Sequence, residues 1–353
     1  MPGWTSLTPL RPVIRGARRA LGRGVDRLRP RALILMYHRV AAVQCDPWEL
    51  CVSPGHFAAQ LEVLREECDV VRLADLLELR RARRVGGRYV AVTFDDGYAD
   101  NLEAARPLLQ RRSCPATFFL TSGALGGARE FWWDELERLV LDPRPLPEEL
   151  ELPVDGSARR WRLDGAASPP PEWSEQHSTW RARNPPRNLR QALFCDLWSI
   201  LHRETRRARE EGLDALHRWA GVPRTPRPTH RVLTREEARR LCDGERFEAG
   251  AHSVTHVALS FQEPAEQAEE ICASKRSLES LTGRPVRHFA YPYGDYSAET
   301  VRMVREAGFD GAVTTDGGRV TRQGSPWRLP RLAVADWDGR EFASRVRAAF
   351  GTR

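Results

Sequence analysis

Short apolar runs recur along the chain, and each one ends in polar residues or glycine. They cover residues 32–37, 89–94, 116–120, 247–251, 288–291, 311–314 and 329–334. Runs of this length bounded by turn residues predict buried β-strands. Helical spacing of apolar positions lies between them, at 54–66, 73–84, 101–111, 264–281 and 298–307. Strands that alternate with helices predict an α/β fold with a parallel sheet, open or closed into a barrel.

Residues 128–230 interrupt this alternation. The segment is rich in proline, arginine and tryptophan, and residues 189–209 could form one helix. We expect an inserted subdomain between two barrel strands. Most of its tryptophans are expected to be buried, while any exposed ones could stack on sugar rings. The predicted organisation is a basic segment over 1–31, a barrel over 32–127 and 231–345, and the insertion.

The N-terminal segment combines apolar positions at helical spacing with arginines between them. Residues 10–29 fit a basic amphipathic helix in peripheral contact with an anionic membrane. A helix packed on the domain and a frayed tail are the alternatives, because Gly16, Gly22 and Gly24 weaken a helix. No apolar run reaches the roughly 20 residues of a membrane span, and arginines interrupt any signal-peptide core. We therefore expect a cytoplasmic protein, peripheral on the inner face of the membrane.

Composition narrows the classes of function. Of the 55 basic residues, all but Lys275 are arginine, and the net charge is +7. The arginines are scattered among acidic residues, with no recognition helix, zinc finger or aromatic single-strand platform, so no nucleic acid partner is expected. The seven cysteines form no CxxC pair. This favours reduced thiols over a disulfide framework or a cysteine zinc site.

Two adjacent carboxylates, Asp95 and Asp96, directly follow the apolar run 89–94. They are expected at the C-terminal end of a strand, which is the catalytic face of a barrel. Adjacent carboxylates repel each other unless a cation compensates their charge. An ordinary Asp-Gly turn is the alternative for the pair taken alone.

Two histidines four residues apart, His252 and His256, follow the run 247–251. We expect them on one face of a helical turn, where they can share a metal with Asp96. One aspartate and two histidines leave coordination positions open, which is typical of a catalytic metal site. These ligands suit zinc, with cobalt, nickel, iron or manganese as alternatives. Two unconnected surface histidines are the other interpretation.

Three further polar residues are predicted near the same mouth of the barrel. His38 follows the first strand, Tyr293 lies in a Tyr-Pro-Tyr-Gly segment after the run 288–291, and Arg331 lies in the last strand. Each alone could be an ordinary surface or turn residue. Their convergence from several strand ends predicts an active site.

The sequences TFDDG (93–97), HSVTH (252–256) and FAYPYGDY (289–296) resemble motifs of the polysaccharide deacetylase family. The resemblance extends over about residues 32–125 and 231–340. It implies a distorted (β/α)7 barrel, one strand short of the eight-stranded standard. It also implies a metal-dependent hydrolase that removes an N-acyl group, above all N-acetyl, from a carbohydrate substrate.

The same resemblance implies a role for each matched residue. Asp95 is the general base that takes a proton from the attacking water. Asp96, His252 and His256 hold the metal, which polarises the amide carbonyl and makes water more acidic. The backbone N–H of Tyr293 stabilises the oxyanion that forms during attack.

Two departures from the family pattern affect these roles. Ala290 stands where the third motif commonly has an arginine that orients the base, and Arg331 is the candidate substitute. The family's C-terminal leucine-histidine motif, which supplies the general acid, is absent. Some family members resemble circularly permuted versions of the fold, in which a histidine near the first strand is the general acid. The pair Tyr37-His38 fits that arrangement, so we assign His38 as the general acid.

Two other functions stay open at this point. One is a deformylase or deacetylase of a lipid-linked sugar or a small glycosylated metabolite, favoured by the expected cytoplasmic location and the basic N-terminal segment. The other is a glycan-binding module with a degenerate site. The intact set of two aspartates and two histidines argues against the binding module.

Overall fold

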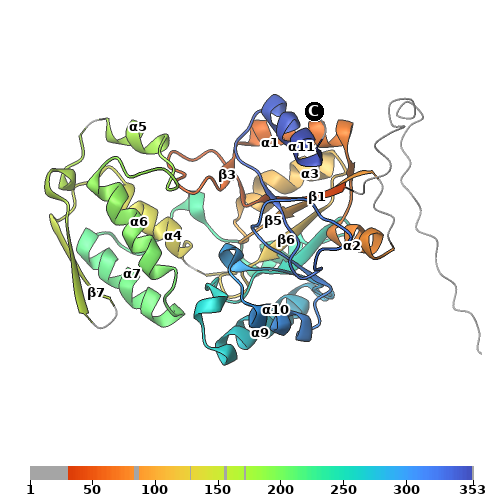
Figure 1. Ribbon diagram of the computed structural model, residues 1–353. Coiled ribbons are helices and arrows are strands. Elements are labelled where there is room, and N and C mark those ends of the chain that lie inside the picture. Colours follow the sequence, from red (N-terminus) through yellow and green to blue (C-terminus); the bar gives the residue numbers. More distant parts are fainter. Residues whose placement is uncertain (1–30, 83–86, 128, 155–156, 171, 352–353) are drawn as a thin grey trace, which may run out of the picture.

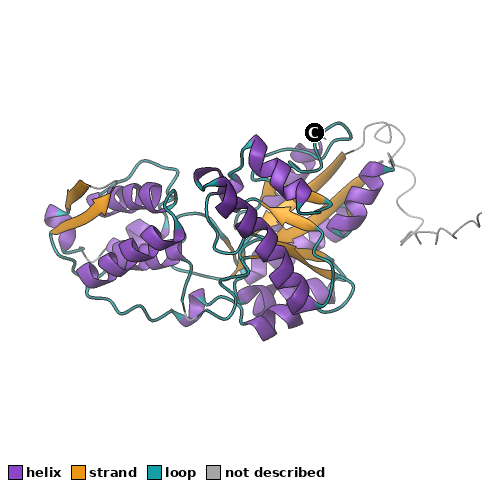
Figure 2. Ribbon diagram, turned by 90° about the horizontal axis from the view of Figure 1, so that it is seen from below, coloured by secondary structure: helices purple, strands orange, loops and turns teal. Residues whose placement is uncertain are grey.

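The computed structural model describes residues 31–82, 87–127, 129–154, 157–170 and 172–351. Figures 1 and 2 show two lobes side by side, one built around a curled sheet and the other formed by helices and one hairpin. The expected amphipathic helix at 10–29 lies outside the described residues. In the part of the chain that is described, no helix combines the length and apolar character of a membrane span. The seven cysteines are free thiols.

Seven parallel strands form the sheet of the larger lobe, in the order β11-β10-β9-β6-β5-β1-β12. They are β1 (Arg31–Tyr37), β5 (Arg88–Phe94), β6 (Ala116–Leu120), β9 (Phe247–Ala251), β10 (His288–Ala290), β11 (Gly311–Val313) and β12 (Leu332–Ala333). Each matches one of the apolar runs. The short strand β4 (Asp69–Val70) adds to β5, and β2 (Arg39–Val40) pairs with β3 (Cys51–Val52).

The sheet closes through the segment just before β12. Leu329 forms a parallel bridge with Val313 of β11, and β12 pairs with β1. Pro330 and Arg331 lie between these two pairings. The strand expected over 329–334 is interrupted there because proline has no N–H to donate to a ladder. The fold is the distorted (β/α)7 barrel that the sequence predicts.

Helices on the outside of the barrel lie between successive strands, and the last helix follows the final strand β12. They are α1 (Pro54–Glu67), α2 (Leu73–Arg81), α3 (Arg106–Arg111), α8 (Arg235–Leu241), α9 (Pro264–Thr282), α10 (Ala298–Glu306) and α11 (Gly339–Phe350). The expected helix at 101–111 begins with a π-helical turn, η3 (Asn101–Ala105), before α3. α1 begins after Ser53, and α10 begins after Ser297. In each case the serine side chain accepts a hydrogen bond from the N–H of the third residue of the helix.

Alternation along β1 separates two apolar layers. Leu33 and Leu35 join the main core between strands and helices. Ala32 and Ile34 point to the opposite face of the sheet, where they join a smaller cluster that contains Phe119. Burial on both faces is typical of parallel strands and explains why these runs read as continuously apolar.

The second lobe is formed by the chain between β6 and β9. Its elements are α4 (Trp132–Leu141), β7 (Glu149–Val154), β8 (Ser157–Arg162), α5 (Trp173–Ser178), α6 (Leu189–Leu201) and α7 (Arg206–Ala220). The prediction of one helix over 189–209 is wrong, because α6 ends at Leu201 and Thr205 caps a new helix by accepting from the Ala208 N–H. Four of its tryptophans are buried: Trp132, Trp133, Trp173 and Trp180.

Candidate active site

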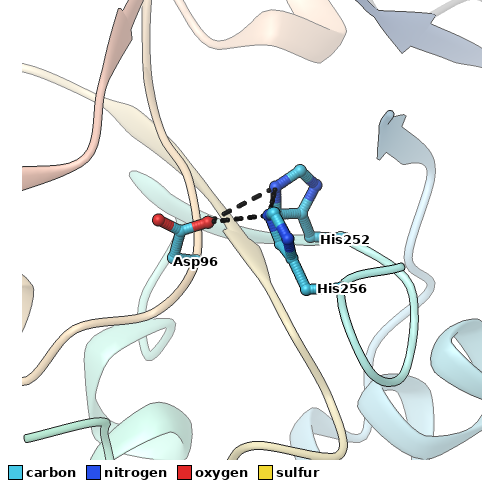
Figure 3. A group of neighbouring side chains, drawn as sticks. All are labelled: Asp96, His252 and His256. Atoms are coloured by element: carbon cyan, nitrogen blue, oxygen red, sulfur yellow. Dashed lines mark hydrogen bonds and ion pairs between the residues drawn. The ribbon is translucent and has the colours of Figure 1, made fainter. Parts of the chain in front are cut away.

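Asp96 meets His252 and His256 at the C-terminal ends of β5 and β9 (Figure 3). Asp96 Oδ1 lies 3.2 Å from His256 Nε2 and 3.5 Å from His252 Nε2, and the two Nε2 atoms are 3.1 Å apart. All three side chains are buried. Ligand atoms around a tetrahedral ion at about 2.0–2.1 Å are roughly 3.3 Å apart. One oxygen and two nitrogens at these separations fit one face of a divalent cation's coordination shell.

The loop that carries the histidines is not the helical turn expected from their spacing. Ser253 and His256 have φ values of 58° and 54°, and Ser253 Oγ accepts from the His256 N–H at 2.9 Å. The carboxylate of Glu270, on α9, accepts from the N–H groups of Val254 and Thr255 at 2.8 Å each. The two imidazoles lie side by side as expected. Their positions are set by a loop in which two residues have the left-handed backbone conformation, and hydrogen bonds stabilise that loop.

Hydrogen bonding and burial prepare the two imidazoles for a cation. His252 Nδ1 lies 2.8 Å from the Ala290 carbonyl, so the Nδ1–H donates there and Nε2 is left facing Asp96. Burial lowers the pKa of His256 to about 4, which keeps this ring neutral near pH 7. Burial by itself would raise the pKa of Asp96, but hydrogen bonds from the two histidines hold it well below its usual range. Burial would lower the pKa of His252, but its hydrogen bond to Asp96 and the charge of Asp95 raise it. Metals bind neutral imidazoles, so a cation would displace a proton from this ring.

Arg331 holds the carboxylate of Asp95 in a two-point contact. Its Nη1 donates to Oδ1 at 2.7 Å and its Nη2 to Oδ2 at 2.6 Å. The guanidinium is itself fixed by the Thr314 carbonyl at 2.9 Å from Nε and by Thr93 Oγ1 at 3.2 Å from Nη1. Burial would raise the pKa of Asp95, but the neighbouring Arg331 charge lowers it below the ordinary value. Asp95 is therefore an ionised carboxylate aligned beside the cation ligands.

Arg331→Met is expected to lower the free energy of unfolding by about 3–5 kcal/mol, because it leaves Asp95 buried without a counter-charge. The folded-state pKa of Asp95 is depressed, so its contribution to stability is present above the ordinary aspartate pKa and is lost as pH falls. In the variant this contribution should vanish. Urea unfolding at neutral and acidic pH measures it. Arg328→Met removes an exposed arginine three residues away and serves as the control. Equal stability of the two variants would contradict the assignment.

His38 and Tyr293 also lie at this mouth. An electrostatic interaction with His38 is the last of several influences on the pKa of both Asp95 and Asp96, so its ring lies near the two carboxylates. Tyr293, three residues after the end of β10, has a φ of 59°. Its ring packs edge-on against His256 with 4.5 Å between centroids, and its hydroxyl donates to the His256 carbonyl at 3.2 Å. The structure thus brings all seven predicted site residues to one end of the barrel.

Two tryptophans at the start of the second lobe also contact the site, and their contribution was not predicted. The Trp133 ring lies 4.6 Å from His256, and Trp132 Nε1 donates to the Tyr293 hydroxyl at 2.8 Å. Trp133 Nε1 donates to the hydroxyl of Tyr98 at 2.8 Å, which in turn donates to a carboxylate of α4. In the sequence, this contribution could have been suspected only from the two adjacent tryptophans at the beginning of the insertion. The second lobe therefore helps to wall the active site.

A family model for polysaccharide deacetylases matches residues 82–144 and 217–312. The match leaves out residues 145–216, which hold most of the second lobe. A polysaccharide deacetylase homologue of Bacillus subtilis (strain 168), YxkH, is 27% identical over 85 residues, which are 24% of this chain and 30% of the relative. The aligned segment thus spans less than a third of that protein's length.

Three solved structures share the fold. The Streptococcus pyogenes deacetylase PplD, in complex with acetate, has a TM-score of 0.55 at 15% identity, over 89% of this chain and 97% of its own. IcaB from Ammonifex degensii has a TM-score of 0.55 at 18% identity, over 90% and 97%. A de-N-acetylase from Aggregatibacter actinomycetemcomitans has a TM-score of 0.54 at 13% identity, over 90% and 99%. The family match and the shared motifs show that residues 82–144 and 217–312 resemble a polysaccharide deacetylase domain.

Proposed function

We propose that the chain is a metal-dependent hydrolase that removes an N-acyl group, in the first place N-acetyl, from an amino sugar of a carbohydrate substrate. One observation carries this proposal. Asp95, kept ionised and aligned by Arg331, lies next to the cation-binding set at the open end of the barrel. A base beside a Lewis-acid site is the combination that amide hydrolysis by water requires.

Asp96, His252 and His256 would hold the cation, for which zinc is our first choice and cobalt, nickel, iron or manganese are alternatives. The cation supplies Lewis acidity that polarises the amide carbonyl and makes water more acidic. Asp95 accepts the proton of the water that attacks the carbonyl carbon. Arg331 fixes the direction from which this carboxylate works.

Two further groups complete the reaction: one stabilises the negative charge that develops on the carbonyl oxygen, and the other protonates the leaving amine. The backbone N–H of Tyr293 donates to the oxygen on which negative charge develops. His38 protonates the amide nitrogen as the C–N bond breaks, so that a free amine and a carboxylate leave. His38 has this role in our proposal because it is the histidine at the end of β1.

Acetate release from N-acetylglucosamine oligomers tests the function. The full-length protein should release acetate, lose this activity after chelation, and regain it with one equivalent of a divalent cation. A glycan-binding module would bind the oligomers and release no acetate with any metal. That second result would reject the hydrolase proposal.

His38→Ala should keep the cation and the fold but lose about 10²-fold or more in turnover on unactivated amides. The loss should shrink on acetanilides with electron-withdrawing rings, because their leaving group needs less protonation. Steady-state kinetics on both substrate types measure the difference. His56→Ala, which changes a histidine in α1, is the control. Unchanged turnover on the unactivated amide would eliminate His38 as the acid.

We further propose a cytoplasmic location, with residues 10–29 in peripheral contact with anionic membrane. The support is the basic amphipathic pattern of those residues. Deletion of residues 1–30 should leave acetate release unchanged and reduce co-sedimentation with phosphatidylserine vesicles. Neutral phosphatidylcholine vesicles are the control. Equal binding of both proteins to the anionic vesicles at low salt would remove the membrane proposal.

A further inference from the structure

A row of aromatic rings runs from the cation site to the protein surface. His256 packs on Tyr293 with 4.5 Å between ring centroids, Tyr293 on His202 with 5.5 Å, and His202 on Phe261 with 5.8 Å. His202 also stacks on Trp198 of α6, at 4.6 Å and 10° between planes. Phe261, at the outer end of the row, is 50% exposed. The second lobe therefore contributes a surface next to the metal ligands that suits the apolar faces of sugar rings.

Arg209 is the fourth residue of α7 and is only 3% exposed. Its Nη2 donates to the Thr255 carbonyl at 3.0 Å, directly before His256. Its guanidinium carbon lies 5.5 Å from the centroid of a Trp132 ring. Its Nε and Nη1 are buried and have no hydrogen-bond partner among the residues that the structure describes.

Arg224, another arginine of the second lobe, has the acidic partners that Arg209 lacks in the described part of the chain. Arg224 forms ion pairs with Glu135, Glu210 and Asp214. For Arg209, no carboxylate of a described residue comes within ion-pair distance. Asp295, a carboxylate that acts electrostatically on His202, is engaged by the N–H and hydroxyl of Ser260 at 2.6 Å each.

Buried charged donors without acceptors are strongly disfavoured, and a ligand that supplies acceptors relieves this. The planar guanidinium fork matches the oxygens of a carboxylate or a phosphate. Arg209 also lies near the N-terminus of a 15-residue helix, where the helix dipole favours negative charge. Both features call for the same kind of ligand, an oxyanion.

We propose that Arg209 binds an oxyanion carried by the substrate, a carboxylate or a phosphate attached to the sugar, while Trp198, His202 and Phe261 pack against the sugar itself. The inference rests on the proposed function, which it narrows to acidic glycans or sugar phosphates. Arg209 contacts the substrate here without taking part in bond breaking.

Equilibrium binding separates this inference from the proposed function, because it needs no turnover. The metal-loaded, full-length protein is titrated calorimetrically with N-acetylglucosamine, N-acetylglucosamine 1-phosphate, N-acetylmuramic acid and inorganic phosphate. We expect at least one acidic sugar to bind about 10- to 100-fold more tightly than the neutral one. Arg209→Gln should abolish that preference and keep the weak binding of the neutral sugar. Arg218→Gln, which removes an exposed charge from the same helix, should keep the preference.

The two acidic sugars identify the source of the oxyanion. Preference for the phosphate alone indicates a sugar phosphate, such as a lipid-linked sugar, and preference for the carboxylate alone indicates an acidic glycan. Equal affinity for all three sugars, or binding of inorganic phosphate without any gain from the sugar, would overturn the proposal. If Arg209→Gln does not fold, Arg209→Lys keeps the charge without the fork and should lose most of the preference. A crystal structure of the unchanged protein with the preferred sugar must place its oxyanion within hydrogen-bond distance of Arg209.

Discussion

Replacing His256 by alanine is expected to remove the bound cation and to reduce acetate release to the uncatalysed background. The three ligand atoms lie within 3.1–3.5 Å of one another, so each is one of the three ligands that this cluster offers the ion. An aspartate and one imidazole do not hold a catalytic cation against exchange with water. His252→Ala should behave in the same way.

Elemental analysis of the purified variants measures this directly, alongside acetate release. His288→Ala is the matched control, because His288 is also buried but begins β10 instead of lying at its C-terminal end. That variant should keep one cation per chain even if its stability falls. Full metal occupancy in His256→Ala would rule out the proposed ligand set.

Asp95→Asn and Asp96→Asn should fail for different reasons, although they change neighbouring residues by the same few atoms. Asp95→Asn should keep the cation and lose about 10²–10⁴-fold in turnover, because an amide cannot accept the proton of water. Asp96→Asn should lose the cation first, because its Oδ1 is the atom that faces both imidazoles.

Metal titration followed by kinetics at saturating metal separates the two variants. Each serves as the control for the other, since both keep the shape of the turn after β5. Recovery of Asp96→Asn by excess metal, with no recovery of Asp95→Asn, is the expected pattern. The reverse pattern would exchange the roles of the two carboxylates.

The barrel could be predicted because its strands are defined locally. Residues 116–120 and 247–251 have the predicted bounds, since polar residues or proline stop each apolar run on both sides. Because such strands are buried on both faces, each one is a continuous apolar run in the sequence. The helices between the strands then restrict the sheet to a few parallel topologies. The contact between Asp95 and Arg331, 236 residues apart, was anticipated through the family resemblance, which implies an arginine beside the base and left Arg331 as the candidate.

Other parts depended on contacts that no local pattern encodes. The left-handed residues of the histidine loop are stabilised by Glu270, which reaches the loop from α9, so the spacing of His252 and His256 could not reveal the backbone. The contributions of Trp133 and Arg209 depend on how the second lobe packs on the barrel. That packing involves residues with neither strand nor helix periodicity around them, and the sequence carries no signal for it.

The seam between β11 and β12 also sets the order in which the active site is completed during synthesis. The cation ligands and Asp95 leave the ribosome long before Arg331, whereas a domain generally folds as a unit. Until the seam forms, Asp95 has no guanidinium partner, and a buried carboxylate without one takes up a proton and cannot act as a base. Asp95 therefore becomes the ionised, aligned carboxylate described above only when the last barrel strand docks.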